Sequence, residues 1–519
     1  MARSWLRRLF RRADPPAPPP PSVPRAEFDA LADRFRDLRA RYDLVRTDDD
    51  NRRHWSNADG LSAAAANAAG VRFLARNRSR YEYDNGAYVN GIVRTRADDL
   101  VGPTGPRLQM AGPDDGLNAA IELVVSTWAA RSYFAEKLHT LDQTRCRDGE
   151  AFALYVTNPR IDFAVQFDIL PIEADRIADP QAFGLMTPNR FDGVEYDNLG
   201  QAVAYWVLDT HPGDQLAGAP LTATRVDARF MLHWFRVDRP GQVRGMPELA
   251  ASLPLSPYQR RWTLATLAAA EYAASQSGVL ETDGPLDPDT TTLSPFQPVE
   301  FDRNTFVELP AGVKLNQLKA EHPNQLYAPV HRQISKEIAR PVRMPGNVAT
   351  ADSSDSNFSS AKLDHMGYRA AIKVDRSFAA LRHLDRIAAE VCREAIAAGL
   401  LPKGVDVLAI PHAWTWAGWA SMDKDQAEQD ASRLINGTLT YPDYCADNGQ
   451  DWRVQLKKKA DSEKYAADLG TSIAPEKPKV PPESPVPEEG APNVKPQAPP
   501  PARAAGDRFR LNGSSGGRA

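Results

Sequence analysis

The succession of a helix, a strand-rich insert and a second helix in the second half of the chain constrains the fold more than any other feature. The first helix is expected to begin at Ser256, an N-cap candidate with proline after it, and to stop at Gly278. Residues 283–323 then interrupt the helical pattern with eight prolines or glycines and contain a predicted pair of strands. A second helix is expected to end near Arg340, because Pro341 follows.

A polar loop and a third long helix come next. Residues 347–360 are rich in serine and aspartate and are interpreted as a loop. The third helix is expected from about Ala361 to Ala398, with Gly399 at its end. Short helices are predicted at about 423–436, 441–447 and 452–467.

The first half of the chain combines helices with strands. Apolar residues recur at helical spacing in residues 25–42, 60–76, 88–100 and 117–140. Apolar runs bounded by turn residues predict strands within 151–156, 163–170, 203–208 and 229–235. The chain is therefore predicted to belong to the α+β class.

Proline marks both ends of the chain. Seven prolines fall between Pro15 and Pro24 and eleven between Pro475 and Pro501, and segments of this composition cannot build a core. The body between them has about 445 residues, ample for a sizeable core. Residues 1–12 carry five arginines among apolar residues, so they are interpreted as a frayed basic tail, a transit-like segment or a short amphipathic helix on a membrane or nucleic acid.

Charge and cysteine content exclude some classes of protein. The chain has 63 lysines and arginines against 67 aspartates and glutamates, a net charge of -4, which argues against a general nucleic-acid coat but leaves a local DNA-handling surface open. The three cysteines form no CxxC pair, so neither a disulfide framework nor a structural zinc site is expected. No apolar run approaches the roughly 18 residues of a membrane-spanning helix.

The second of the two helices has a basic face. Arg332, Lys336, Arg340 and Arg343 are spaced i, i+4, i+8 and i+11, so on a continuous helix they lie on one side and can present cations to a polyanion. The alternative interpretation is the solvated face of an ordinary surface helix. Pro341 is expected to kink the helix before Arg343.

Motifs of catalysis are mostly missing from the sequence. It has no GxxxxGK[ST] phosphate loop, no GxGxxG and no HExxH, and its one GxSxG match lies in the C-terminal tail without the strand and helix that a nucleophile elbow needs. No catalytic residue, metal site or cofactor is therefore predicted. The alternative is a metal-dependent nucleic-acid-processing enzyme that uses Asp352 and Asp355.

Five stretches together resemble the lambda-type family of tailed-phage portal proteins. They are RNRSRYEYDNGAYVNGIVRTRADDLVGPTGPRLQ (76–109), RDGEAFALYV (147–156), DGVEYDNLGQAVAYWV (192–207) with HPGD after it, HWFRVDRPGQVRGMPELAASL (233–253) and SDSNFSSAKLDH (354–365). They occur in the family's order and span most of the chain. Phe358 stands where the family usually has tyrosine, Lys362 where it has arginine, and the VGPTG turn carries an extra proline.

The resemblance implies a portal fold, in which wing, stem, clip and crown regions build a dodecameric ring at one capsid vertex. The two helices around the insert would be the stem. The boundaries are expected at 1–25 for a basic arm, 26–254 for the wing, 255–282 for the first stem helix, 283–323 for the clip, 324–342 for the second stem helix, 343–362 for the tunnel loop, 363–405 for the long wing helix, 406–470 for the crown and 471–519 for a disordered tail.

The implied function is a channel through which the terminase packages double-stranded DNA and from which the DNA is later ejected. Expected partners are further copies of the chain, sequence-independent double-stranded DNA, the terminase large subunit, a head–tail connector or adaptor, and the major capsid and scaffold proteins, without a small-molecule substrate. The protein would reside in the virion of a phage or prophage after assembly in the host cytoplasm. A third hypothesis, a membrane-associated scaffold, rests on residues 1–12 alone.

Specific residues are expected to contact DNA or line the tunnel. The DNA-channel residues would be Arg332, Lys336, Arg340, Arg343 and Lys362. The tunnel-loop residues would be Asn347, Asp352, Asp355, Asn357 and Phe358. Contacts to DNA must be to phosphates, because any sequence has to pass.

Overall fold

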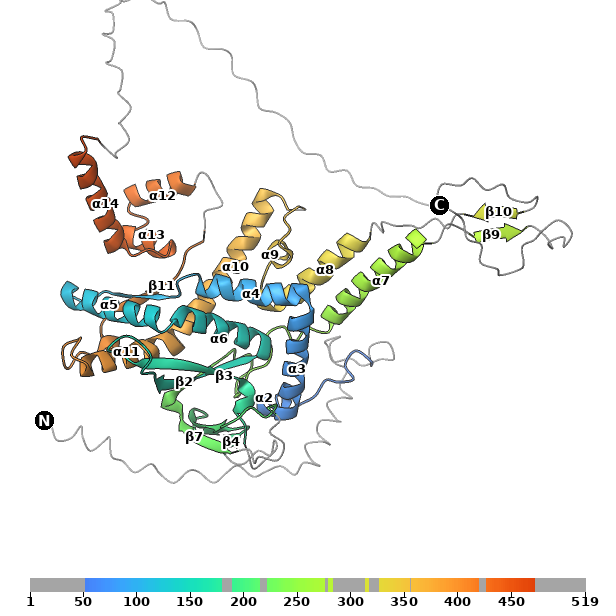
Figure 1. Ribbon diagram of the computed structural model, residues 1–519, viewed down its shortest axis with the longest axis horizontal. Coiled ribbons are helices and arrows are strands. Elements are labelled where there is room, and N and C mark those ends of the chain that lie inside the picture. The colour runs from blue at the N-terminus through green and yellow to red at the C-terminus, as the bar shows by residue number, and fades with distance from the viewer. Residues whose placement is uncertain are drawn as a thin grey trace, which may run out of the picture. The chain divides into compact units, whose positions relative to one another are not determined.

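The computed structural model describes residues 52–179, 189–214, 222–275, 279–282, 313–316, 326–354, 356–419 and 426–471 (Figure 1). The chain divides into two units, residues 1–452 and 453–519, of which the second is described only up to residue 471. The expected N-terminal arm, the helix at 25–42 and nearly all of the predicted disordered tail lie outside the described residues. None of the described helices is long and apolar enough to span a membrane.

Helices dominate residues 63–148. In order, the elements are α2 (Ala63–Ala66), α3 (Ala69–Asn85), α4 (Ala87–Val101), β1 (Arg107–Met110), α5 (Asp115–Arg131) and α6 (Phe134–Asp148). The prediction of one helix over 117–140 is wrong, because Tyr133 adopts a left-handed backbone conformation (φ 54°) and separates α5 from α6. The Asp114 side chain caps α5 by accepting a hydrogen bond from the N–H of Leu117 at 3.0 Å.

Two antiparallel sheets follow. The first has the strand order β3–β2–β8, with β2 (Glu150–Thr157), β3 (Phe167–Ile172) and β8 (Met231–Phe235). The second has the order β4–β5–β6–β7, with β4 (Arg190–Phe191), β5 (Val194–Tyr196), β6 (Ala202–Leu208) and β7 (Ala223–Asp227). The mixed helix and sheet class is confirmed, although the strand expected at 163–170 begins only at Phe167.

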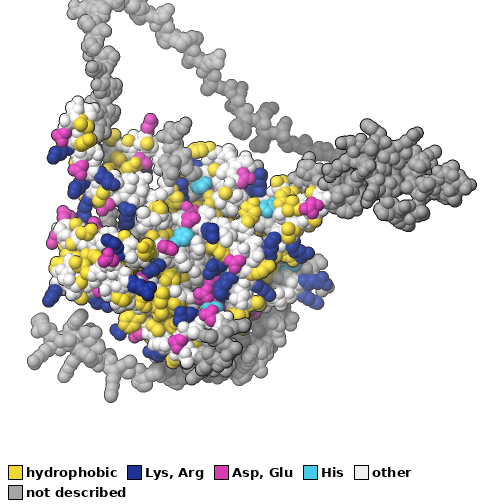
Figure 2. All heavy atoms as spheres, viewed as in Figure 1, with side chains coloured by type: hydrophobic (Ala, Val, Ile, Leu, Met, Phe, Trp, Pro, Cys, Tyr) yellow, Lys and Arg dark blue, Asp and Glu magenta, His cyan; other side chains and the backbone are white. Residues whose placement is uncertain are grey.

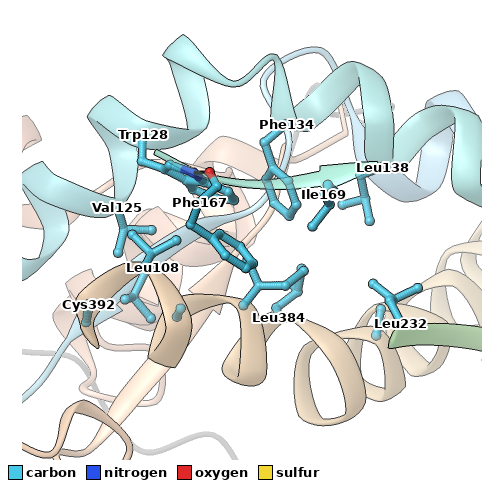
Figure 3. Packing of buried hydrophobic residues seen from close by; sticks show 14 of the residues in the cluster. Leu108, Val125, Trp128, Phe134, Leu138, Phe167, Ile169, Leu232, Leu384 and Cys392 are labelled. Atoms are coloured by element: carbon cyan, nitrogen blue, oxygen red, sulfur yellow. Dashed lines mark hydrogen bonds between the residues drawn. The ribbon is translucent and has the colours of Figure 1, made fainter. Parts of the chain in front are cut away.

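The main core lies between the first sheet and the helices α5, α6 and α11 (Asp385–Ala397). Figure 3 shows Trp128, Phe134 and Phe167 in contact at its centre. Trp128 is 1% exposed, and its indole N–H donates a hydrogen bond to the Phe167 carbonyl at 2.7 Å, so this large ring is buried without leaving its polar atom unpaired. The core thus fixes α11 against residues far away in sequence.

The two helices around the insert are present. α7 (Leu255–Ser275) and α8 (Tyr327–Ala339) contact each other, and β9 (Val279–Thr282) pairs antiparallel with β10 (Val313–Asn316) at the ends of the insert. The strand pair predicted between them lies outside the described residues. The expected N-cap at Ser256 is wrong, because α7 begins at Leu255 and the Ser256 hydroxyl donates to the Glu82 carboxylate at 2.7 Å.

The predicted polar loop at 347–360 is shorter than expected. α9 (Gly346–Thr350) occupies its start and α10 (Phe358–Ala379) its end, so residues 351–357 connect the two helices. Asn357 caps α10 by accepting a hydrogen bond from the Ser360 N–H at 2.8 Å, so the helix begins at Phe358, three residues before the expected start at Ala361. The long third helix is confirmed, with a π-helical turn at 380–384 between α10 and α11 and with Gly399 in the left-handed conformation at its end.

The last three described helices agree with the sequence prediction, whereas the strand before them was not predicted. In order, these elements are β11 (His412–Thr415), α12 (Gln426–Ile435), α13 (Tyr441–Asp447) and α14 (Trp452–Asp468). β11 pairs antiparallel with β1, which joins two segments about 300 residues apart in the sequence, a contact that local periodicity cannot indicate.

Candidate nucleic-acid interface

The visible face of the molecule carries acidic and basic side chains interspersed, without one broad basic surface (Figure 2). A contact with DNA on this face would therefore be local. The basic side of α8 is the segment that the sequence singles out. Its opposite side packs into the protein: Ser335 and Ile338 are fully buried, and the Gln259 side chain of α7 donates to the Ser335 hydroxyl at 2.6 Å.

Arg332 binds the connection that follows α9. Its guanidinium lies 3.2 Å from an Asp352 carboxylate oxygen and donates to the Ser354 hydroxyl at 3.2 Å. Hydrogen bonds from Ser354, with the backbone N–H first, hold the pKa of Asp352 below its ordinary value, so the carboxylate remains charged and paired. Arg332 is thus partly neutralised and fastens the start of residues 351–357 to α8.

Lys336 of α8 and Arg340, the residue that directly follows the helix, are exposed cations. Neither forms an ion pair with any residue that the structure describes, and both side chains are solvent-exposed. The methylene groups of Lys336 lie along Gly346, where an added Cβ would come within 2.6 Å of the Lys336 Cγ. Glycine at 346 therefore leaves room for the lysine stem, while the ammonium group stays in solvent.

Arg343 does not continue the basic face. α8 ends at Ala339, a 3-10 turn covers 340–342, and Arg343 takes a left-handed conformation (φ 62°), as expected from the proline at 341. Its guanidinium donates two hydrogen bonds of 2.8 Å to Asp375 of α10. Asp375 also pairs with the buried Arg96 at 2.7 Å, so Arg343 is tied to the protein interior.

The predicted tunnel-loop residues fall on three different elements. Asn347 is in α9, where its side-chain amide nitrogen lies 3.1 Å from the His365 ring. Phe358 is the first residue of α10 and is 59% exposed, and Lys362 is half-buried one turn further on. Asp355 lies outside the described residues.

The metal-dependent alternative finds little support in this geometry. Asp352, one of its two proposed ligands, is engaged with Arg332. Elsewhere, Glu173, Asp175 and His211 place potential ligand atoms within 4.8 Å of one another. The His211 Nδ1 accepts the Gly213 N–H at 2.9 Å, whereas a metal-bound histidine donates its second ring nitrogen. His211 Nε2 lies 2.8 Å from the Glu173 carboxylate.

Four of the five stretches that resemble portal proteins meet at one buried ion cluster, which sequence reasoning missed. Arg244 is fully buried, and its Nε and Nη2 donate to the two oxygens of Glu150 at 2.8 and 2.7 Å. Asp192 lies 3.2 Å from Arg244, and Arg76 lies 3.6 Å from Glu150. We name these four residues the Glu150 cluster. A signal was present in α3, where Arg72, Arg76 and Arg80 recur every four residues and face inward rather than to solvent.

The Glu150 cluster is held in its charged state. Burial alone would raise the pKa of Glu150, but the charge of Arg244 and hydrogen bonds from His233 and Arg244 hold it well below its ordinary value. The Gly245 N–H adds a hydrogen bond to Glu150 at 3.1 Å, and a Cβ on Gly245 would collide with the carbonyl oxygen of Gly149. Glycine at both positions therefore lets the two segments approach closely.

A second set of buried ion pairs links the segment that follows α8 to the core. Arg96 of α4 pairs with Asp142 of α6 at 2.7 Å, and Arg145 pairs with Glu248 at 2.6 Å. Since Arg96 also binds Asp375, the partner of Arg343, this network connects the candidate interface to the helices that surround it.

The comparisons with known proteins decide the family. The profile described as "Phage portal protein, lambda family" matches residues 49–376. The chain belongs to the lambda family of phage portal proteins. A protein named "Probable portal protein" from Halomonas phage phiHAP-1 is 26% identical over 392 residues, which cover 70% of this chain and 74% of the relative. Portal proteins of this family are structural components of the virion and not enzymes.

Solved structures with some likeness come from gene transfer agent (GTA) particles. Chains from the virion of the native particle, the neck of the empty particle and the neck of the native particle have TM-scores of 0.38, 0.43 and 0.39 with 13–14% identity. The matches cover 70% of this portal protein and 89–90% of those chains. Likeness at this level does not establish a shared architecture.

Proposed function

We propose that this portal protein forms a ring, expected to be a dodecamer, whose central channel passes double-stranded DNA during packaging and ejection. The proposed partners are the terminase large subunit, a head–tail connector, and the capsid and scaffold proteins. The membership of the chain in the portal family carries this proposal. α7 and α8 would form the stem and residues around β9 and β10 the clip, with assembly in the host cytoplasm.

Within that ring, Lys336 and Arg340 are the proposed DNA-facing residues. Ring symmetry repeats each of them in every subunit, so two exposed cations per chain become bands of positive charge while the subunit remains net acidic. Contacts of this kind reach only phosphates, so they are independent of sequence. Arg332 and Asp352 would hold the start of the tunnel loop against α8, which places that loop beside the two cations.

Disruption of this gene in a virus or prophage that carries it tests the proposal. We expect capsids to assemble without DNA, because no channel is present through which the terminase can translocate it. The measurement is the amount of nuclease-protected viral genome per capsid, with a plasmid-borne wild-type copy as the control that restores it. Protected genomes at the wild-type level in the disrupted strain would contradict the proposed role.

A further inference from the structure

The outer side of α10, continued into the π-helical turn after it, carries an unbroken apolar stripe. Leu363, Val374, Phe378 and Leu381 are 68%, 46%, 57% and 69% exposed. Gly367 and Ala370 fill the positions between them, and both are exposed as well. The six residues follow one another at intervals of three or four, so they lie on one side of the helix (α10 in Figure 1). We name this set the α10 stripe.

The same helix is already buried on its opposite side. Tyr368, Ile372 and Ala379 are at most 3% exposed and pack into the protein. An amphipathic surface helix shows charged residues opposite its buried face, whereas a helix that is apolar on both sides is enclosed on both sides. No charged residue interrupts the α10 stripe, so its sequence is that of a helix buried in an assembly.

The size of the α10 stripe fits a protein interface. From Leu363 to Leu381 it runs along about 27 Å of helix. Its four large side chains present on the order of 400 Å² of apolar surface, at roughly 100 Å² for each Leu, Val or Phe side chain. A stable interface takes roughly 800 Å² from each partner, so the stripe supplies about half of one side. Gly367, where an added Cβ would meet nothing within 4 Å, forms a shallow notch at its middle.

A second charge-free surface is present on α7. Between Arg261 and Glu271 there is no charged residue, and Trp262, Leu264 and Leu267 are 37%, 60% and 56% exposed. Contacts that close a ring join two different surfaces of the same chain, one on each neighbour. This chain has two separate apolar helix surfaces, one on α10 and one on α7, as a ring contact between neighbouring copies requires. Binding of one different protein would explain only one of these two surfaces.

We propose that the α10 stripe of each subunit packs against the neighbouring copy of this chain; this rests on the ring proposed above. Protection of a thiol in assembled protein tests it. The three native cysteines, Cys146, Cys392 and Cys445, are buried, so an introduced cysteine is the reactive one. Maleimide should label Leu363→Cys at least about tenfold more slowly in the ring than in unassembled chains.

Leu199→Cys is the matched control, because Leu199 is 83% exposed in the turn before β6. It should react at similar rates in both states. Equal rates for Leu363→Cys in rings and free chains would overturn the proposal. Protection in both states would also overturn it, because residues of the same chain would then cover the stripe.

A second experiment places glutamate in the α10 stripe and measures whether rings still form. The full-length Leu363→Glu/Phe378→Glu double variant should remain unassembled at concentrations where the wild type forms rings, and Leu199→Glu should still form them. Circular dichroism checks that the double variant is folded. If the variant is unfolded, the labelling rate of Leu363→Cys tests the proposal instead. If the double variant forms rings, the proposed α10 interface is wrong, but the proposal that the protein forms a ring still stands. A wild type that never forms rings contradicts both.

Discussion

Arg244→Met is expected to lower the free energy of unfolding by about 3–5 kcal/mol, because it leaves the buried Glu150 carboxylate without its bidentate partner. Glu150 and Arg244 are both fully buried; of the other cations that act on Glu150, Arg76 lies 3.6 Å away, and Arg72 interacts with it through its charge. The measurement is urea unfolding of the full-length protein followed by circular dichroism. Thermal unfolding should show a fall in the melting temperature of about 10 °C.

Two comparisons make this result specific. Arg225→Met removes an ion pair of similar length, 2.7 Å to Glu195, but Arg225 is exposed to solvent, so the expected loss of stability is much smaller. Glu150→Gln/Arg244→Met should be less destabilised than the sum of the two single variants, because it leaves no uncompensated charge. Equal effects of Arg244→Met and Arg225→Met would show that the buried pair has no special role.

The acid sensitivity of the fold should follow from the same pair. The folded-state pKa of Glu150 lies below its ordinary value, so its contribution to stability is present above the unfolded-state pKa and is lost as the pH falls through the folded one. Arg244→Met removes the main cause of that lowering. Acid unfolding of this variant should therefore begin at a higher pH than that of the wild type.

Reversal of the charges of Lys336 and Arg340 has the largest expected effect on function. Lys336→Glu/Arg340→Glu should reduce nuclease-protected genomes by roughly tenfold or more while rings still form, because acidic bands in the channel repel phosphates. Both side chains are exposed, Lys336 in α8 and Arg340 directly after it, so the fold should not be disturbed. The measurement is complementation of a disrupted portal gene, with ring formation checked by electron microscopy.

Two control variants separate channel charge from other effects. Lys336→Arg/Arg340→Lys keeps both charges and should package normally, because contacts to phosphates need charge rather than a particular side chain. Lys403→Glu/Arg229→Glu makes the same change in net charge at exposed positions away from α8 and should also package normally. Normal genome content in the Lys336→Glu/Arg340→Glu variant would contradict the assignment of these residues to the channel.

Elements with strong local signals were predictable from the sequence. α12, α13 and α14 and the end of α11 at Gly399 follow helical periodicity and capping residues, which act within one turn. The break between α5 and α6 was not predicted, because the left-handed conformation of Tyr133 has no glycine or asparagine to indicate it. The pairing of β1 with β11 depends on tertiary packing and has no local signature.

The candidate site was only partly predictable. The spacing of Lys336 and Arg340 identified an exposed basic side, but it did not show that Arg332 is paired with Asp352. Arginine is treated as a surface residue in sequence patterns, so the burial of Arg244 went unnoticed even though its stretch was recognised. The carboxylates that make such burial tolerable, Asp192 and Glu150, lie 52 and 94 residues away in the chain.

The mass of the intact assembly tests the central claim most directly. Native mass spectrometry of the full-length, uncrosslinked protein should give a closed species near twelve times the 57.1 kDa subunit mass, with a central hole in negative-stain images. A chain that stays monomeric or dimeric, both alone and when produced with its capsid proteins, would contradict the ring and the channel built on it.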